Sequence, residues 1–275
     1  MMLRRSFRAM GTDVELLLDA EPGERAERAL ELAEAEFERF EQVMSRFRDD
    51  SELSRLNRDG RIDGASPDLV RVVKLALAAR ESTGGRFDPT VHDAVVAAGY
   101  DRTFADVPAE TAGPASAPAP CGGAVSVDGL TVALGPGTRL DLGGIGKGYA
   151  ADRVAELLAL AGPCLVNAGG DLAVRGGAWP VGVTDEITLE LTRGGIATSG
   201  RDRRRWRVAG TEMHHLIDPS TGSPADGDLI SVTVVADSAA NAEVLAKAAF
   251  LGAVIDVPHV LVTADGQTVL AGGLA

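Results

Sequence analysis

The chain has 275 residues, of which 45% are hydrophobic and 24% are charged, so its composition is that of a folded protein with room for one large domain or two small ones. Its formal net charge of −13 repels polyphosphate backbones and argues against a general nucleic-acid-binding protein. No apolar run reaches the length of a membrane span, and two cysteines, Cys121 and Cys164, are too few for a disulfide framework or a structural zinc site.

The amino terminus opens with two basic residues, Arg4 and Arg5, as many export signals do. Residues 8–13 then carry charged and polar side chains where a signal peptide needs an apolar stretch. Neither a small-residue cleavage site nor a lipidation cysteine follows. With so few cysteines, this pattern predicts a reduced protein of the cytoplasm.

Apolar spacing predicts the elements in the first third of the chain. Residues 13–20 predict a strand, which Pro22 and Gly23 end. Next, apolar side chains recur at spacings of three and four among charged ones and predict an amphipathic helix with one buried stripe, formed by Leu30, Ala33, Phe37, Phe40 and Met44. A second helix is predicted from the capping residue Ser66 to about Thr83, where two glycines follow.

The rest of the chain mixes strands and helices without regular alternation, which favours an α+β fold over a doubly wound parallel sheet. Residues 105–123 are rich in Ala, Pro and Gly and predict a surface loop rather than a domain boundary. The further predicted elements are strands at 130–134 and 164–168, helices at 148–160 and 238–251, several short strands through residue 235, and two closing strands.

The strongest local signal for a binding site is the glycine-rich segment 140–149, which carries Lys147 between a strand end and a helix. Backbone N–H groups, a helix amino terminus and an ammonium together suit an anion such as a phosphate. The spacing fits neither a Walker A loop nor a dinucleotide-binding fingerprint. The alternative is a plain turn with a solvated lysine, but lysine is rare in this chain and occurs only at positions 74, 147 and 247.

A second candidate is the histidine pair His214 and His215, which precedes the turn at Asp218 and Pro219. Adjacent residues of a strand point to opposite faces, so only one histidine can face a given site and a two-histidine metal clamp is not expected. That histidine can act as a general base or donate to a phosphate. A structural histidine at a strand edge is the open alternative.

Three other segments are less informative by themselves. The arginine-rich run 201–207 predicts either solvated side chains or a local funnel for anions. Residues 85–90 place an aromatic ring and a carboxylate before a turn. Glu243 and Lys247 lie four residues apart on the late helix, the spacing of an ordinary helical ion pair.

Taken in order, the motifs of this chain resemble the ApbE family, the FAD:protein FMN transferases. The resemblance extends over nearly the whole chain. It is carried by the segments 9–12, 45–47, 51–57, 85–91, 141–152, 167–171, 198–200 and 215–222.

The resemblance implies one α+β domain over residues 1–275, related to the tunnelling fold, with mixed or antiparallel sheets, flanking helices and a cleft for FAD. Family members cleave the FAD pyrophosphate, transfer FMN to a Ser or Thr hydroxyl of an acceptor protein and release AMP. The implied FAD contacts are Met10, Phe47, Phe87, Asp88, Asp141, Lys147 and His215. The implied catalytic residues are His215, as the base that takes the hydroxyl proton, and Lys147, which neutralises pyrophosphate charge.

The expected magnesium site departs from the family pattern. The family's ligands map to the backbone carbonyl of Gly144 and to two positions on the late helix, which here hold Glu243 and Lys247. A glutamate can bind Mg²⁺ but a lysine cannot. Lys247 therefore either replaces the charge of the metal, or marks a protein that binds flavin without transferring it, or swings away so that the metal finds other ligands.

We therefore expect a transferase that uses FAD as substrate, with Mg²⁺ in doubt, and an intracellular acceptor protein as partner. No nucleic acid and no membrane span are expected. The alternatives are a flavin- or nucleotide-binding protein without transferase activity and an FAD pyrophosphatase, in which water replaces the acceptor hydroxyl.

Overall fold

Eight strands form the largest sheet of the protein, whose computed structural model describes residues 1–112 and 117–274. Each neighbouring pair of these strands runs antiparallel. From one edge to the other they are β1 (Met2–Ala9), β2 (Thr12–Asp19), β7 (Cys164–Ala168), β8 (Asp171–Gly182), β9 (Thr188–Gly200), β14 (Leu229–Ala236), β15 (His259–Thr263) and β16 (Thr268–Ala271).

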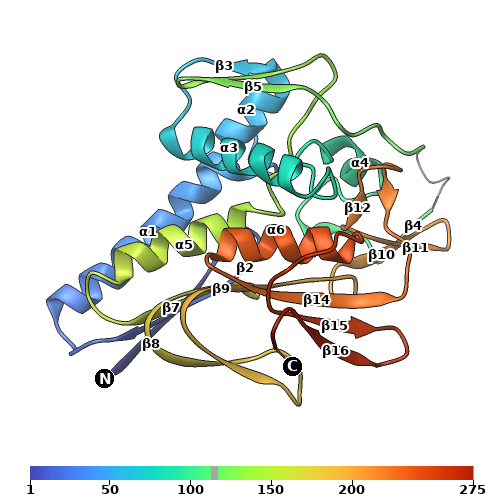
Figure 1. Cartoon of the computed structure of the whole chain (residues 1–275). Coiled ribbons are helices and arrows are strands. Elements are labelled where there is room, and N and C mark those ends of the chain that lie inside the picture. Colours follow the sequence, from blue (N-terminus) through green and yellow to red (C-terminus); the bar gives the residue numbers. More distant parts are fainter. Residues whose placement is uncertain (113–116, 275) are drawn as a thin grey trace.

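Three helices cover one face of this sheet: α1 (Glu24–Met44), α5 (Gly146–Leu158) and α6 (Ala239–Phe250) (Figure 1). The main core lies between the two layers. Strand β2 alternates buried and less buried residues, so that Leu16 and Leu18 enter the same core as Phe37 of α1. Burial of these apolar side chains is the main favourable contribution to folding.

Smaller elements lie beyond the helices (Figure 1). Helices α2 (Glu52–Asp59) and α3 (Pro67–Ser82) accompany a three-stranded sheet of β3 (Arg61–Ile62), β6 (Thr131–Leu134) and β5 (Val125–Asp128). Helix α4 (His92–Ala97) and the 3₁₀ turn Phe104–Asp106 accompany β4 (Glu110–Thr111), β10 (Arg205–Val208) and β11 (Thr211–His214). The hairpin of β12 (Ile217–Asp218) and β13 (Ser223–Pro224) follows.

The α+β class and antiparallel sheets predicted from the sequence are confirmed. The predicted strand at 164–168 has the observed bounds, and the helix predicted at 148–160 begins two residues earlier and ends at Leu158. Strand β1 and the short helices α2 and α4 were not predicted. No helix among residues 1–112 and 117–274 is long and apolar enough to cross a membrane.

The loop predicted at 105–123 needs one correction, because part of it is regular. Within it, β4 pairs in parallel with β10, and the N–H groups of Arg207 and Ala209 donate to the carbonyls of Ala109 and Thr111. This pairing depends on a strand about a hundred residues away, which local composition does not reveal. Residues 113–116 of the predicted loop lie outside the described residues.

Candidate active site

A cavity of about 320 Å³ lies where the helices α1, α5 and α6 meet the smaller elements. Among the predicted site residues, the side chains or backbone that line it are Met10, Phe47, Asp141, Lys147 and His215. Further lining residues include Arg46, Tyr100, Phe104, Arg204 and Lys247. The cavity thus combines aromatic rings with several cationic groups.

The turn between β1 and β2 brings Met10 to this cavity. Met10 and Gly11 both have left-handed backbone conformations, with φ of 51° and 69°, as a two-residue hairpin turn requires. A non-glycine residue in this conformation is uncommon and is often found at functional sites. The turn therefore fixes an apolar, polarizable side chain at the cavity.

The glycine-rich segment is held from two sides before it reaches the cavity. Asn57 of α2 clamps the backbone of Leu140, donating to its carbonyl at 2.8 Å and accepting from its N–H at 2.7 Å. The N–H of Asp141 donates to the carbonyl of Pro89 at 2.8 Å, and the N–H of Gly143 donates to the Asp141 carboxylate at 2.6 Å. These bonds tie the loop to α2 and to the turn at Pro89.

Arg46 sits between this loop and the aromatic part of the cavity. Its Nε lies 3.0 Å from Asp141 Oδ2, and its guanidinium carbon lies 4.1 Å and 4.5 Å from the ring centroids of Phe47 and Tyr100. Burial raises the pKa of Asp141, but Arg46 and then Lys247 outweigh it, so the pKa is below its ordinary value. The Nη2 atom of Arg46 is buried without a hydrogen-bond partner among the described residues, and this leaves a donor for a ligand.

Lys147 is bound by two carboxylates. Its Nζ lies 2.6 Å from Asp171 Oδ2 and 2.5 Å from Glu243 Oε1. Burial lowers its pKa, but the two carboxylates outweigh burial and raise it above the ordinary value. Burial and the neighbouring Asp171 raise the pKa of Glu243. Glu243 also accepts from the N–H of Gly148 at 2.9 Å, so it joins α6 to the start of α5.

The two histidines have different environments, because His214 ends β11 and His215 lies in the bend that follows it. His214 is buried, with Nε2 at 2.9 Å from the carbonyl of Ala225, and its Nδ1 accepts from the N–H of Leu216. His215 lines the cavity, and its Nδ1 is buried without a hydrogen-bond partner among the described residues. Burial, followed by the positive charges of Arg204 and Lys247, holds the pKa of His215 well below its ordinary value. His215 is therefore neutral near pH 7 and able to accept a proton.

The residues at the expected magnesium site do not fit a divalent cation. Lys147 already binds Glu243, and the Lys247 ammonium lies so close to Gly144 that a methyl group there would collide with it. Within the described ranges, no group of three or more His, Cys, Asp or Glu residues is arranged to hold a metal. Two ammonium groups stand where Mg²⁺ requires oxygen donors.

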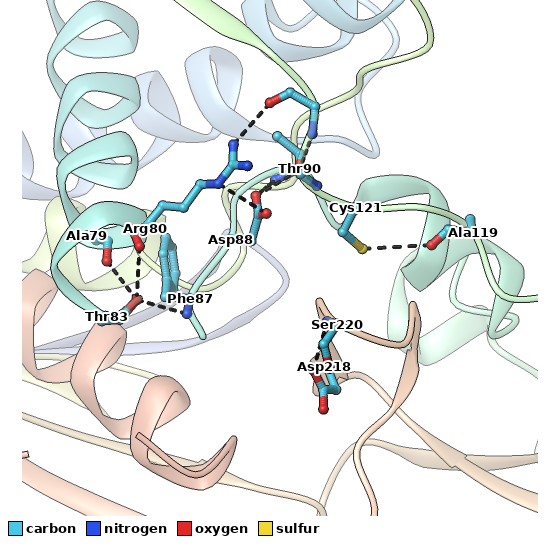
Figure 2. A network of polar contacts seen from close by, with 12 residues as sticks. Ala79, Arg80, Thr83, Phe87, Asp88, Thr90, Ala119, Cys121, Asp218 and Ser220 are labelled. Carbon is cyan, nitrogen blue, oxygen red and sulfur yellow. Dashed lines mark hydrogen bonds and ion pairs between the residues drawn. The ribbon is translucent and has the colours of Figure 1, made fainter. Parts of the chain in front are cut away.

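Phe87 and Asp88 lie outside the cavity lining, although the sequence analysis expects both to contact FAD. Phe87 is part of the main core. Asp88 accepts from the N–H and hydroxyl of Thr90 at 2.8 Å and 2.7 Å and pairs with Arg80 of α3 at 3.3 Å (Figure 2). This network holds the turn in which the Pro89 carbonyl accepts from the N–H of Asp141. Phe87 and Asp88 therefore stabilise the loop that lines the cavity and do not line it themselves.

Several cavity residues were not among the predicted site residues, including Arg46, Tyr100, Phe104 and Arg204. Arg204 belongs to the arginine-rich run, for which an anion funnel was one of two predictions. It lines the cavity, whereas its neighbours Arg203 and Arg205 are exposed. The adjacent pair of Arg46 and Phe47 was visible as a motif, but only the fold brings Tyr100 against it, with 5.6 Å between the rings of Phe47 and Tyr100.

The fold and the cavity define an α+β protein whose cavity is lined by both aromatic rings and cationic side chains. Comparison with known sequences gives the family: the profile of the ApbE family matches residues 10–270, and the chain belongs to this family. The resemblance predicted from the sequence motifs is thereby confirmed.

Two curated relatives and two solved structures illustrate the similarity. The FAD:protein FMN transferase of Escherichia coli (strain K12) is 28% identical over 261 residues, which cover 81% of this chain and 71% of that protein. That of Treponema pallidum (strain Nichols) is 30% identical over 269 residues, or 84% and 73% of the two chains.

Among solved structures, an ApbE protein of Thermotoga maritima msb8 matches with a TM-score of 0.85 at 24% identity, covering 98% of this chain and 97% of that one. The flavin transferase ApbE of Vibrio cholerae matches with a TM-score of 0.79, also at 24% identity and with coverage of 98% and 97%. At this identity the structures establish the shared fold.

Proposed function

We propose that this protein transfers FMN from FAD to a Ser or Thr hydroxyl of an acceptor protein and releases AMP. The observation that carries the proposal is a single cavity in which a neutral histidine with an unpartnered buried nitrogen faces both cationic groups and aromatic rings. Membership of the ApbE family and the printed names of its curated relatives support the same activity.

The cavity divides the binding of FAD between two kinds of group. Phe47 and Tyr100 offer faces for the flat rings, and Met10 adds polarizable apolar surface. Arg204 and Lys247 line the same cavity and supply positive charge for the diphosphate. The charge of Lys147 is offset by its two carboxylate partners. Because Asp141 is already paired with Arg46, its negative charge is offset and does not repel the ligand.

The transfer step needs a base and a leaving group. His215 takes the proton of the acceptor hydroxyl, whose oxygen forms a bond to the phosphorus of the FMN half. The bond from that phosphorus to the bridging oxygen breaks, and AMP leaves with the electron pair. Negative charge on the phosphoryl oxygens is met by the nearby cations, since positioning and electrostatics supply most of the catalysis in phosphoryl transfer.

Binding of FAD also changes the pKa of His215. Burial and then the surrounding cations keep His215 neutral in the free protein, and an incoming diphosphate offsets the charge of the cations. The pKa of His215 then rises towards its ordinary value, which makes the histidine a stronger base once the substrate is in place.

Two measurements on the purified protein separate this activity from its alternatives. The protein is incubated with FAD and a degenerate peptide library that carries a central Ser or Thr, while AMP release and covalent flavin fluorescence on the peptides are followed. Transfer predicts AMP and labelled peptide in equal amounts. AMP without labelled peptide indicates a pyrophosphatase, and FAD binding without AMP release indicates a binding protein; either result overturns the proposal.

A further inference from the structure

The two lysines of the cavity differ in what they bind. Lys147 Nζ contacts two carboxylate oxygens at 2.6 Å and 2.5 Å, so its charge is neutralised within the protein. The Lys247 ammonium lines the same cavity, and the described residues offer it no hydrogen bond or ion pair. An ammonium has three donors, and leaving them unpaired in a largely buried position is costly.

The surroundings of Lys247 explain why it has no protein partner. Burial lowers the pKa of Lys247 below its ordinary value, and the carboxylates that oppose this effect are Asp141 and Glu243. Arg46 holds Asp141, and Lys147 holds Glu243. The cavity lining holds more cationic side chains than carboxylates: Arg46, Arg48, Lys147, Arg204 and Lys247 against Glu41 and Asp141, with Asp171 and Glu243 paired to Lys147. In a chain of net charge −13, Lys247 thus belongs to a local excess of positive charge.

Lys247 occupies the expected magnesium site, where a divalent cation does not fit. Its stem and ammonium pass directly over Gly144, which has no side chain to obstruct them. Helix α6 holds the lysine one turn after Glu243, so its backbone is fixed by the packing of α6 on β9 and α5. The ammonium therefore sits in the cavity before any ligand arrives.

We propose that the Lys247 ammonium binds the diphosphate of FAD in place of a divalent metal ion, so that this protein binds and uses FAD without Mg²⁺. This inference rests on the proposed function for its ligand. An ammonium neutralises a phosphoryl oxygen as a compact point charge and donates hydrogen bonds to it. A magnesium ion supplies the same electrostatic stabilisation through a higher charge.

Lys247 also has a structural role, because it lies in the last turn of α6 and a cation there is favourable for the helix dipole. That role affects stability and leaves the affinity for FAD unchanged. A test must therefore measure affinity, and it must compare ligands with and without the diphosphate.

The experiment measures the dissociation constants of FAD and riboflavin by fluorescence titration, in EDTA and in excess MgCl₂. For the unaltered protein we expect the same FAD affinity in both buffers. For Lys247→Met, which keeps the length of the stem, we expect FAD affinity about tenfold to a hundredfold weaker and riboflavin affinity unchanged, since riboflavin has no diphosphate. The exposed Lys74 of α3 gives the control Lys74→Met, for which both affinities are unchanged.

A second variant restores an oxygen donor. Lys247→Asp places a carboxylate beside Glu243 and Gly144, so its FAD affinity is expected to be weak in EDTA and to recover in MgCl₂. The inference is overturned if the unaltered protein binds FAD only with Mg²⁺, or if Lys247→Met binds FAD as tightly as the unaltered protein. The EDTA comparison needs no variant, so a Lys247 variant that fails to fold still leaves a decisive result.

These outcomes are separate from the fate of the proposed function. Tight, metal-free FAD binding without AMP release or peptide labelling overturns the proposed transfer and supports the role of Lys247. Peptide labelling that disappears in EDTA overturns the role of Lys247 and supports transfer.

Discussion

At the scale of single residues, the histidine pair shows what a short motif can predict. Alternation along a strand predicted that only one of His214 and His215 faces a site. The fold decides which one, because β13 brings the Ala225 carbonyl within 2.9 Å of His214 and leaves Nδ1 of His215 unpaired. A partner eleven residues away in a hairpin is not visible in the local pattern.

Replacing His215 tests its role as the base. His215→Gln removes the proton acceptor but keeps a polar side chain of similar size, so we expect the rate of FMN transfer to fall by about 10² to 10⁴ while FAD affinity changes little. Single-turnover peptide labelling measures the rate. His259→Gln, in β15 and outside the cavity lining, is the matched control. A rate for His215→Gln within a few-fold of the unaltered protein would show that another group takes the proton.

The pH dependence of transfer follows from the lowered pKa of His215. Burial and the charges of Arg204, Lys247, His214 and Lys147 all disfavour its protonated form in the free protein. The neutral, active form therefore persists as pH falls through about 6.5, where an ordinary histidine becomes protonated. We expect kcat/KM to stay level between pH 8 and about 6.5 and to decline only below that. A decline in kcat/KM that is half complete at about pH 7 and is absent in His215→Gln would contradict a lowered pKa of His215.

At the scale of elements, the helices were predictable where periodicity and capping agree. Ser66 and Ser238 do accept from the N–H groups of Leu69 and Asn241 at the starts of α3 and α6, as expected of capping residues. Strand β1 was missed because Arg5 stands on its less exposed face, between Leu3 and Phe7, and interrupts the apolar alternation. Helix α2 was missed because only Leu53 and Leu56 of its eight residues are buried, too few to show a helical period.

The contact between α5 and α6 depends on a glycine. A Cβ atom at Gly148 would lie 2.5 Å from the carbonyl oxygen of Ala239 and 2.6 Å from its carbon, so even a methyl group would force the helices apart. We expect Gly148→Ala to lower the free energy of unfolding by about 1–3 kcal/mol despite the better helix propensity of alanine. The substitution would also displace the N–H of residue 148 and so weaken the hydrogen bond that it donates to Glu243.

Equilibrium urea unfolding measures this cost. Gly182→Ala is the control, because a Cβ atom at Gly182 meets nothing within 4 Å. If Gly148→Ala leaves stability within about 0.5 kcal/mol of the unaltered protein, the two helices are not packed as closely as described.

At the scale of the whole molecule, the cavity collects residues from distant parts of the chain. Met10 comes from a strand turn, Arg46 from the end of α1, Tyr100 from the segment after α4, and Lys247 from α6. The glycine loop and the family motifs were enough to select Met10, Phe47, Asp141, Lys147 and His215, which all line the cavity. They could not predict that Lys147 is bound by Asp171 and Glu243, because that triad exists only after β8, α5 and α6 have packed together.

The net charge of the chain acts at the same scale. A protein of charge −13 repels a dianionic ligand at long range, so the cations of the cavity must attract FAD over a short distance. The carboxylates near the cavity weaken that attraction only in part, since Arg46 offsets Asp141 and Lys147 is shared between Asp171 and Glu243.

One crystal structure tests the central claim most directly: the protein with FAD bound, grown in EDTA. The account predicts the diphosphate within hydrogen-bonding distance of Lys247 Nζ, the flavin ring beside Phe47 and Tyr100, and FAD phosphorus within reach of a hydroxyl activated by His215. FAD bound away from this cavity, or a diphosphate that turns away from Lys247, would contradict it.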